Sequence, residues 1–165
     1  MEGVDPKEWA LFQAKQELYQ QYNEKLVCEV LANMAKPDWQ TETHYDKGEK
    51  GVDIIAEKDN VVVVIEAKGE RENTSQTSGE SRIMAALGQI IMRMGNEEPD
   101  KKYHYCVAFP DTKAFTKSKI PLKPRKLLGI TVLYVDCPNN AVKIVYPEAV
   151  HAQALNTFDG IVHIY

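Results

Sequence analysis

Cysteine is scarce in this chain of 165 residues, and no apolar run is long. Cys28, Cys106 and Cys137 are odd in number and far apart, which excludes a Cys-x-x-Cys zinc or redox pair and favours reduced thiols in the cytoplasm. The apolar stretches at 61–65 and 127–135 are shorter than the roughly 20 residues that span a bilayer. No basic start followed by an apolar stretch marks a secretory signal. The sequence therefore predicts a soluble, cytoplasmic protein without a membrane partner.

Motifs of several other classes are missing as well. The chain has no glycine-rich phosphate loop and no Gly-x-Ser-x-Gly nucleophile, which disfavours an NTPase or a serine hydrolase. The spacing of the four histidines suggests no metal site. Net basic charge is also lacking, because 20 Lys and Arg stand against 24 Asp and Glu, for a formal charge of −4. Any contact with nucleic acid must therefore come from a local basic patch.

The order of apolar patterns predicts a single α/β domain over residues 1–165. Residues 5–35 carry apolar side chains at helical spacing, with Asp5-Pro6 as a start signal and Lys36-Pro37 as an end signal. The pattern of residues 148–165 is ambiguous, although apolar and polar residues alternate in the last five as in a short strand. The other expected elements are three strands within 40–68, a helix at 81–94, a strand at 102–109, an irregular basic segment at 113–126 and strands at 130–136 and 141–146.

The most informative stretch reads GVDIIAEKDNVVVVIEAKGE. If Asp59-Asn60 form the two-residue turn of a hairpin, Asp53 lies directly opposite Glu66, with Cβ atoms about 4.5–5.5 Å apart. Period-two alternation places Lys68 on the same face as Glu66. Two carboxylates and an ammonium group then meet at the open end of the hairpin, at the edge of a dry valine and isoleucine core. A register slip of one residue would move Asp53 to the other face.

This charged triplet is suited to metal-assisted hydrolysis of phosphodiesters. Like charges directly opposite each other destabilise a sheet, and a divalent cation that bridges the carboxylates compensates for them. Mg²⁺ fits best, because it takes oxygen ligands from one or two carboxylates together with water and phosphate oxygens. A lysine beside the ion can orient water or stabilise charge that grows on a phosphate. The alternative is coincidence, because Glu-x-Lys is a frequent tripeptide.

With these residues, the chain resembles the PD-(D/E)XK nuclease superfamily: an acid begins one strand, Glu-x-Lys ends the next, and a helix lies before and after. The segment NEKLVCEVL followed by GVDIIAEKDN is similar to Mrr-like restriction families, which carry a helix glutamate ahead of Gly-Val-Asp. ALGQIIMR, EPDKKYHYCVAFP and LLGITVLYVD resemble XisH-like DNA-excision controlling factors. The resemblance covers residues 23–147 and implies a restriction endonuclease-like fold, with a central mixed β-sheet flanked by helices.

The resemblance also implies roles for particular residues. Asp53 and Glu66 would bind Mg²⁺ or Mn²⁺, helped by the backbone carbonyl of Ala67, and Lys68 would serve the attacking water. Glu24 matches the first-helix glutamate of the family, which can complete the acidic cluster. For Glu24 the alternative is a solvated surface glutamate, since other glutamates share its helix.

Two sets of residues are candidates for nucleic-acid binding. Arg82, Gln89 and Arg93 lie within about 40° of one another on the second expected helix, beside its apolar face. Gln89 stands where the superfamily often has the glutamine of Gln-x-x-x-Tyr, although position 93 is arginine here. The alternative is an ordinary solvated helix flank. The second set lies between 113 and 126, where no acid occurs and the cations are Lys113, Lys117, Lys119, Lys123, Arg125 and Lys126. These cations can track a phosphate backbone or simply keep the chain soluble.

The leading hypothesis is a Mg²⁺-dependent DNA endonuclease that leaves 5′-phosphate ends, as the resemblance implies. One small chain holds one centre and cuts one strand, so double-strand cleavage would require a homodimer. The second hypothesis is a non-catalytic, XisH-like regulatory or scaffold subunit that acts with a protein partner in DNA excision or defence. The acidic net charge favours it. The same residues would also serve a junction- or structure-selective nuclease.

Overall fold

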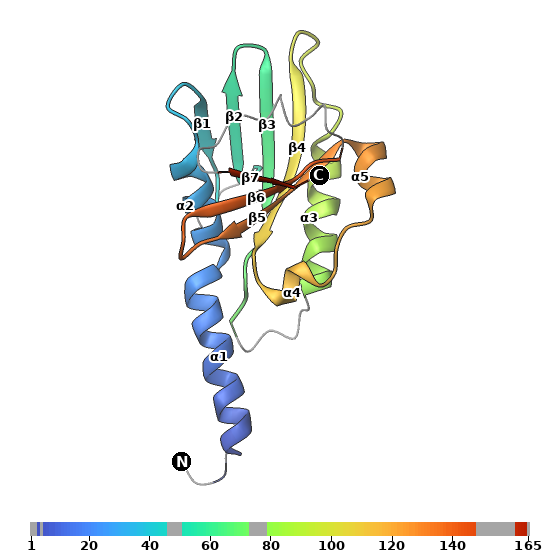
Figure 1. Cartoon of the computed structure of the whole chain (residues 1–165). Helices are drawn as coiled ribbons and strands as arrows, with labels where there is room; N and C mark the ends of the chain where they lie inside the picture. The colour runs from blue at the N-terminus through green and yellow to red at the C-terminus, as the bar shows by residue number, and fades with distance from the viewer. Residues whose placement is uncertain (1–2, 4, 46–50, 73–78, 148–160, 165) are drawn as a thin grey trace.

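The computed structural model describes residues 3, 5–45, 51–72, 79–147 and 161–164. Figure 1 labels its helices and strands. In chain order they are α1 (Pro6–Tyr22), α2 (Glu24–Met34), β1 (Gln40–Thr43), β2 (Ile54–Lys58), β3 (Val61–Ala67), α3 (Gly79–Arg93), β4 (Lys102–Pro110), α4 (Lys113–Thr116), α5 (Leu122–Leu128), β5 (Ile130–Asp136), β6 (Ala141–Val145) and β7 (Ile161–Ile164).

In the part of the chain that the structure describes, seven strands form one mixed sheet in the order β1 to β7. Pairing is antiparallel within β1–β2–β3 and between β5 and β6, and parallel within β3–β4–β5 and between β6 and β7. Strands β5 to β7 run across β2 and β3 in Figure 1, because strand twist accumulates across the sheet. The predicted α/β class, with a mixed sheet between helices, is confirmed.

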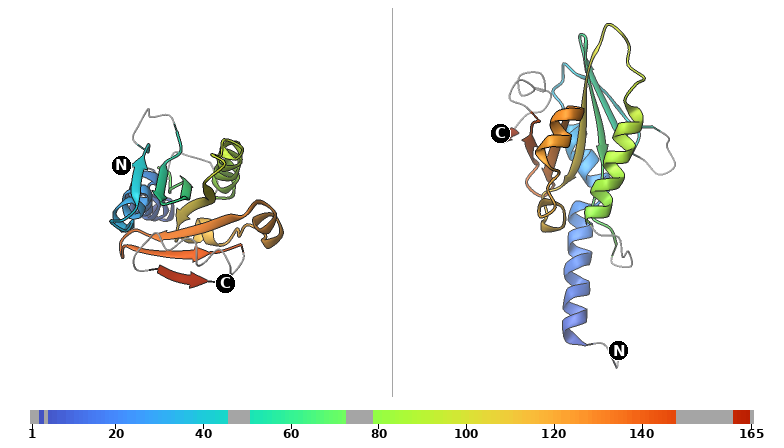
Figure 2. Two further views of the ribbon diagram at one scale, coloured as in Figure 1. Left: turned by 90° about the horizontal axis from the view of Figure 1, so that it is seen from above. Right: turned by 90° about the vertical axis from the view of Figure 1, so that its right-hand side faces the viewer.

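Helices cover both faces of this sheet (Figure 2). On one face, α2 buries Val27, Cys28 and Leu31 against alternate residues of β2 and β3. On the other face, α3 packs its buried apolar side chains, which are Ile83, Ala86 and Ile90, on β3, β4 and β5. Because β3 is covered on both sides, it is buried from Val62 onward, as a strand inside a layered domain requires.

The single helix predicted over residues 5–35 is wrong, because the chain breaks at Asn23. Asn23 has extended backbone angles, φ −64° and ψ 162°, and its side chain accepts a hydrogen bond of 3.0 Å from the Leu26 N–H. Asn23 is therefore the N-cap of α2, a position where asparagine is common. Asn23 also forms a β-bridge with Glu70. The break makes Glu24 the first residue of α2, with its backbone next to Gly69 just after β3.

Helix α1 departs further from the expectation, since none of its residues is buried. Trp9, Leu11, Phe12 and Leu18 are all exposed, and the rings of Trp9 and Phe12 stack on each other with centroids 5.4 Å apart. Figures 1 and 2 show this helix projecting away from the sheet. Apolar side chains at helical spacing usually face the core, but of the two helices within 5–35 only α2 buries them. None of the described helices combines the length and the apolar character needed to cross a membrane.

The basic segment at 113–126 was expected to be irregular, and it contains two short helices instead. Phe115 of α4 is buried and stacks on Phe109, with ring centroids 5.6 Å apart. Pro121 and Pro124 lie at the N-cap and in the first turn of α5, where a missing N–H costs no hydrogen bond. Gly129 ends α5 with a φ of 63°.

Candidate active site

The β2–β3 hairpin has the predicted register. Ile54 pairs with Ile65 and Lys58 with Val61, so the turn consists of Asp59 and Asn60. Asp59 has a φ of 54°, a left-handed conformation that aspartate tolerates in a tight turn. The same register, extended by one residue beyond β2, sets Asp53 beside Glu66.

Asp53, Glu66 and Lys68 converge and are buried, with exposed fractions of 8%, 3% and 9%. The Ala67 N–H donates to Asp53 Oδ2 at 2.7 Å, and this bond ties the acid before β2 to the end of β3. Lys68 Nζ donates to Glu66 Oε1 at 3.2 Å. Glu66 Oε2 is buried without a hydrogen-bond partner among the described residues. Among the described residues, one carboxylate oxygen at the centre of the group is thus available to a ligand.

Burial dominates the electrostatics of the two acids. It raises the pKa of Asp53, against the hydrogen bond from Ala67 and the charge of Lys68, which both lower this pKa. Burial, and next the nearby Asp53 carboxylate, raise the pKa of Glu66 to about 7. Two carboxylates in one dry site resist ionising together. Without a cation, the pair therefore retains a proton in the neutral pH range.

A divalent ion fits this donor set. Deprotonated Asp53 and Glu66 would present oxygen ligands together with the Ala67 carbonyl, and Mg²⁺ is commonly held by one or two carboxylates and water. Within the described ranges, no three His, Cys, Asp or Glu side chains are grouped as a metal site. A cation here would therefore have two carboxylate ligands and not a complete cage of side chains.

Glu24 lies near the pair but is committed to another contact. Its Oε2 is 3.2 Å from Arg82 Nη2, an ion pair that joins the start of α2 to α3. Burial raises the pKa of Glu24, the charge of Lys68 lowers it, and the charge of Asp53 raises it again. Glu24 therefore belongs to the electrostatic surroundings of the centre but does not complete a cluster of three carboxylates.

Arg82 is more buried than the sequence predicts for a residue beside the apolar face of its helix. Only 5% of the residue is exposed, and Nε and Nη1 have no hydrogen-bond partner among the described residues. Helical spacing could not predict this burial. It gives the direction of a side chain but not how deeply a neighbouring helix buries it. A buried guanidinium with free N–H groups is suited to an oxyanion.

The other predicted substrate contacts are spread along α3 and the basic segment. Gln89 and Arg93 are exposed, and Arg93 is close enough for its charge to lower the pKa of both Asp53 and Glu66. Arg125 is partly buried, and it donates to the carbonyls of Ile120 at 3.1 Å and Tyr146 at 3.2 Å. The lysines of the segment are exposed; they are Lys113, Lys117, Lys119, Lys123 and Lys126.

The fold and the site together define an α/β protein with a buried centre of two acids and a lysine at the end of a β-hairpin. No family model matches the chain, and no curated protein matches it. Two solved structures are similar. One is an XisH family protein from Nostoc punctiforme PCC 73102, with 22% identity over 71% of this chain and 95% of that chain and a TM-score of 0.46. The other is an fdxN element excision controlling factor protein from Anabaena variabilis, with 25% identity, 72% and 95% coverage and a TM-score of 0.47.

Proposed function

We propose that this protein is a Mg²⁺- or Mn²⁺-dependent DNA endonuclease. The observation that carries the proposal is the buried Asp53–Glu66 pair with Lys68 beside it, in which Glu66 Oε2 has no partner among the described residues. A buried, unpaired carboxylate oxygen destabilises a fold. A bound cation removes that cost and lets both acids ionise.

Each residue of the centre has a task in hydrolysis. A bound Mg²⁺ would polarise the phosphodiester and make water a better nucleophile. Asp53 and Glu66 would hold the ion with the Ala67 carbonyl, and the Ala67 N–H fixes the orientation of Asp53. Lys68 would orient the attacking water, since its ammonium group lies on Glu66 at the edge of the centre. Arg93 would attract the phosphate.

Plasmid nicking tests the proposal. Supercoiled and single-stranded DNA, and RNA of the same sequence, are incubated with the protein in Mg²⁺, Mn²⁺ or EDTA. Asp53→Asn and Lys68→Ala should each abolish metal-dependent cleavage. Their matched controls, Asp59→Asn in the hairpin turn and Lys102→Ala at the far end of β4, should cleave as the wild type does. Activity that survives in Lys68→Ala, or that is the same in EDTA, would contradict the proposal.

A second candidate function is a non-catalytic regulatory or scaffold subunit that acts with a protein partner. The exposed apolar side chains of α1 favour it, because an exposed apolar surface often marks a site of protein–protein interaction. The acidic net charge favours it too, since a nuclease that finds DNA alone gains from a basic surface. Absence of cleavage in every metal condition, with a folded wild type, would support this candidate over the first.

A further inference from the structure

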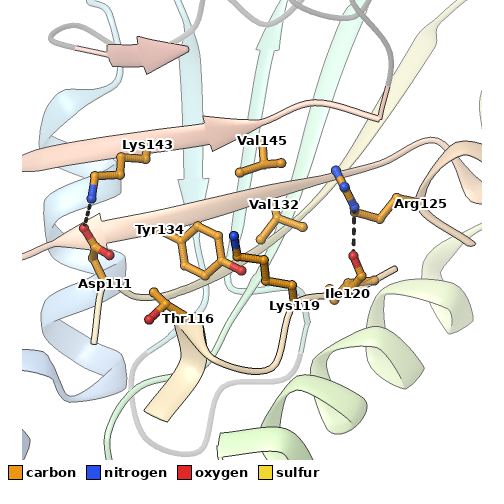
Figure 3. Close-up of a pocket in the computed structure, with 9 residues that line it drawn as sticks. All are labelled: Asp111, Thr116, Lys119, Ile120, Arg125, Val132, Tyr134, Lys143 and Val145. Carbon is orange, nitrogen blue, oxygen red and sulfur yellow. Dashed lines mark hydrogen bonds and ion pairs between the residues drawn. The ribbon is translucent and has the colours of Figure 1, made fainter. Parts of the chain in front are cut away.

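A separate cavity of about 430 Å³ lies between β5, β6 and the segment that carries α4 and α5 (Figure 3). Its walls combine cations with apolar and aromatic side chains. The residues that line it are Asp111, Thr116, Lys119, Ile120, Arg125, Val132, Tyr134, Lys143 and Val145. Three of these side chains are cationic and one is anionic, so the lining is basic in a protein whose net charge is acidic.

Strand register places this cavity on the same sheet face as the acid pair. Residues paired directly across strands point to the same face. Glu66 pairs with Val107, Val107 with Val132, and Val132 with Val145. The last two of these residues line the cavity. The row therefore places the candidate metal centre and the cavity wall on one face of the sheet, with the core beneath α3 between them.

A second row leads to the same place. Phe109 pairs with Tyr134, and Tyr134 pairs with Lys143. Lys68 extends the β3–β4 ladder beside Phe109, because its N–H donates to the Ala108 carbonyl at 2.9 Å. Two to three strand spacings separate β3 from β5 and β6, which is about 10–15 Å.

The polar groups of the cavity are partly fixed and partly available. Lys143 pairs with Asp111 at 2.6 Å, and Arg125 is held by two backbone carbonyls. Lys119 has no ion-pair or hydrogen-bond partner among the described residues, and in Figure 3 it extends into the same space as the ring of Tyr134. An anchored guanidinium beside an uncommitted ammonium group suits a phosphate.

Beside these cations the lining is apolar, formed by the partly buried ring of Tyr134 with Val132 and Val145. Nucleobases stack on such aromatic surfaces once they leave a duplex. Cations next to an aromatic surface match the two halves of a nucleotide, which are its phosphate and its base. An inorganic anion would leave the aromatic wall unused.

We propose that this cavity binds one nucleotide of a single-stranded segment of the substrate, with its phosphate on Lys119 and Arg125 and its base against Tyr134. The proposal rests on the function proposed above, because the bound nucleotide belongs to the strand that reaches the acid pair. It narrows the substrate to nucleic acid with an unpaired stretch near the cleaved bond.

Binding without metal separates this proposal from catalysis. Protein with labelled Ile and Val methyl groups is titrated in EDTA with dAMP, with inorganic phosphate and with a single-stranded oligonucleotide, and its NMR spectrum is followed. Methyl signals of Ile120, Val132 and Val145 should shift with dAMP and with the oligonucleotide, and less with phosphate. Lys119→Ala should raise the Kd for dAMP about tenfold. Tyr134→Leu should weaken dAMP binding while phosphate binding is kept.

Matched variants make the outcome decisive. Asp59→Asn in the hairpin turn should bind as the wild type does, because it lies outside both the cavity and the acid pair, and Lys102→Ala controls for loss of one positive charge. An unchanged Kd in Lys119→Ala, or shifts confined to other methyl groups, would overturn the proposal. Binding of dAMP without the oligonucleotide would overturn the strand assignment in favour of a free nucleotide. Nucleotide binding without any metal-dependent cleavage would remove the proposed nuclease function and leave the cavity as a nucleotide site.

Discussion

Glu66 makes the folded state sensitive to pH because its surroundings oppose its charge. Its pKa is about 7 in the fold, raised first by burial and then by Asp53. Between the ordinary glutamate value and this one, the folded protein binds more protons than the unfolded chain, so the free energy of unfolding falls as pH rises. This contribution is largest below about pH 4.5 and is gone above about pH 7.

Glu66→Gln should therefore stabilise the metal-free protein at about pH 8, by about 1–2 kcal/mol, and much less at about pH 5. The amide keeps the shape of the side chain and offers Lys68 an oxygen, but it carries no charge to be buried. Chemical denaturation in EDTA at the two pH values measures the difference. Glu29→Gln on the exposed side of α2 is the control. A glutamine variant that loses stability at alkaline pH would contradict the expectation.

Metal binding should show the opposite pH dependence. Before a cation binds, the acid pair must release the proton that its raised pKa values retain, so affinity rises with pH. Excess Mn²⁺ should increase the Tm of the wild type more at about pH 8 than at about pH 6. In Asp53→Asn the increase should be lost at both values. Differential scanning fluorimetry measures it, and a shift that persists in Asp53→Asn would place the ion elsewhere.

At the scale of elements, Gly69 holds the start of α2 against the end of β3. A Cβ at this position would lie 2.0 Å from the backbone nitrogen of Glu24, with no flexible side chain there to yield. Gly69→Ala should therefore destabilise the fold by about 2–4 kcal/mol and displace Glu24 from Arg82. Gly88→Ala is the matched control, since its Cβ meets nothing within 4 Å. It should stabilise α3 by about 0.5–1 kcal/mol.

Equilibrium urea unfolding of both alanine variants measures the contrast. Equal effects would show that α2 adjusts to the added methyl group, and the tight contact at Gly69 would then not fix the position of Glu24.

Local chemistry made some elements predictable and hid others. The hairpin followed from Asp59-Asn60 and the β-branched run, because a two-residue turn sets the register by itself. The break at Asn23 was hidden, because its bridge to Glu70 joins residues far apart in the chain. The α4 helix depends likewise on Phe115 stacking against Phe109. Convergence of Asp53, Glu66 and Lys68 was predictable from register, whereas burial of Arg82 required knowing that α2 reaches α3.

For the molecule as a whole, α1 contributes little to the free energy of unfolding. None of its residues is buried, and the last residue, Tyr22, holds it to the body through the hydroxyl contact with Asp136 at 3.4 Å and the carbonyl that accepts from the Glu70 N–H at 2.8 Å. Removing residues 1–18 leaves both contacts and both core clusters in place. The free energy of unfolding should therefore fall by less than about 1 kcal/mol.

The same truncation also tests what the exposed helix is for. If α1 carries the contact between chains that double-strand cleavage requires, the truncated protein should sediment as a monomer while the full chain sediments as a dimer. Nicking of one strand should continue, because Asp53, Glu66 and Lys68 all lie outside α1. Sedimentation velocity and plasmid nicking on the same preparations measure both properties. If the truncated protein is unfolded, the core depends on α1. If the full chain is monomeric at all concentrations, α1 does not mediate a dimer, and its apolar surface would instead bind a different protein.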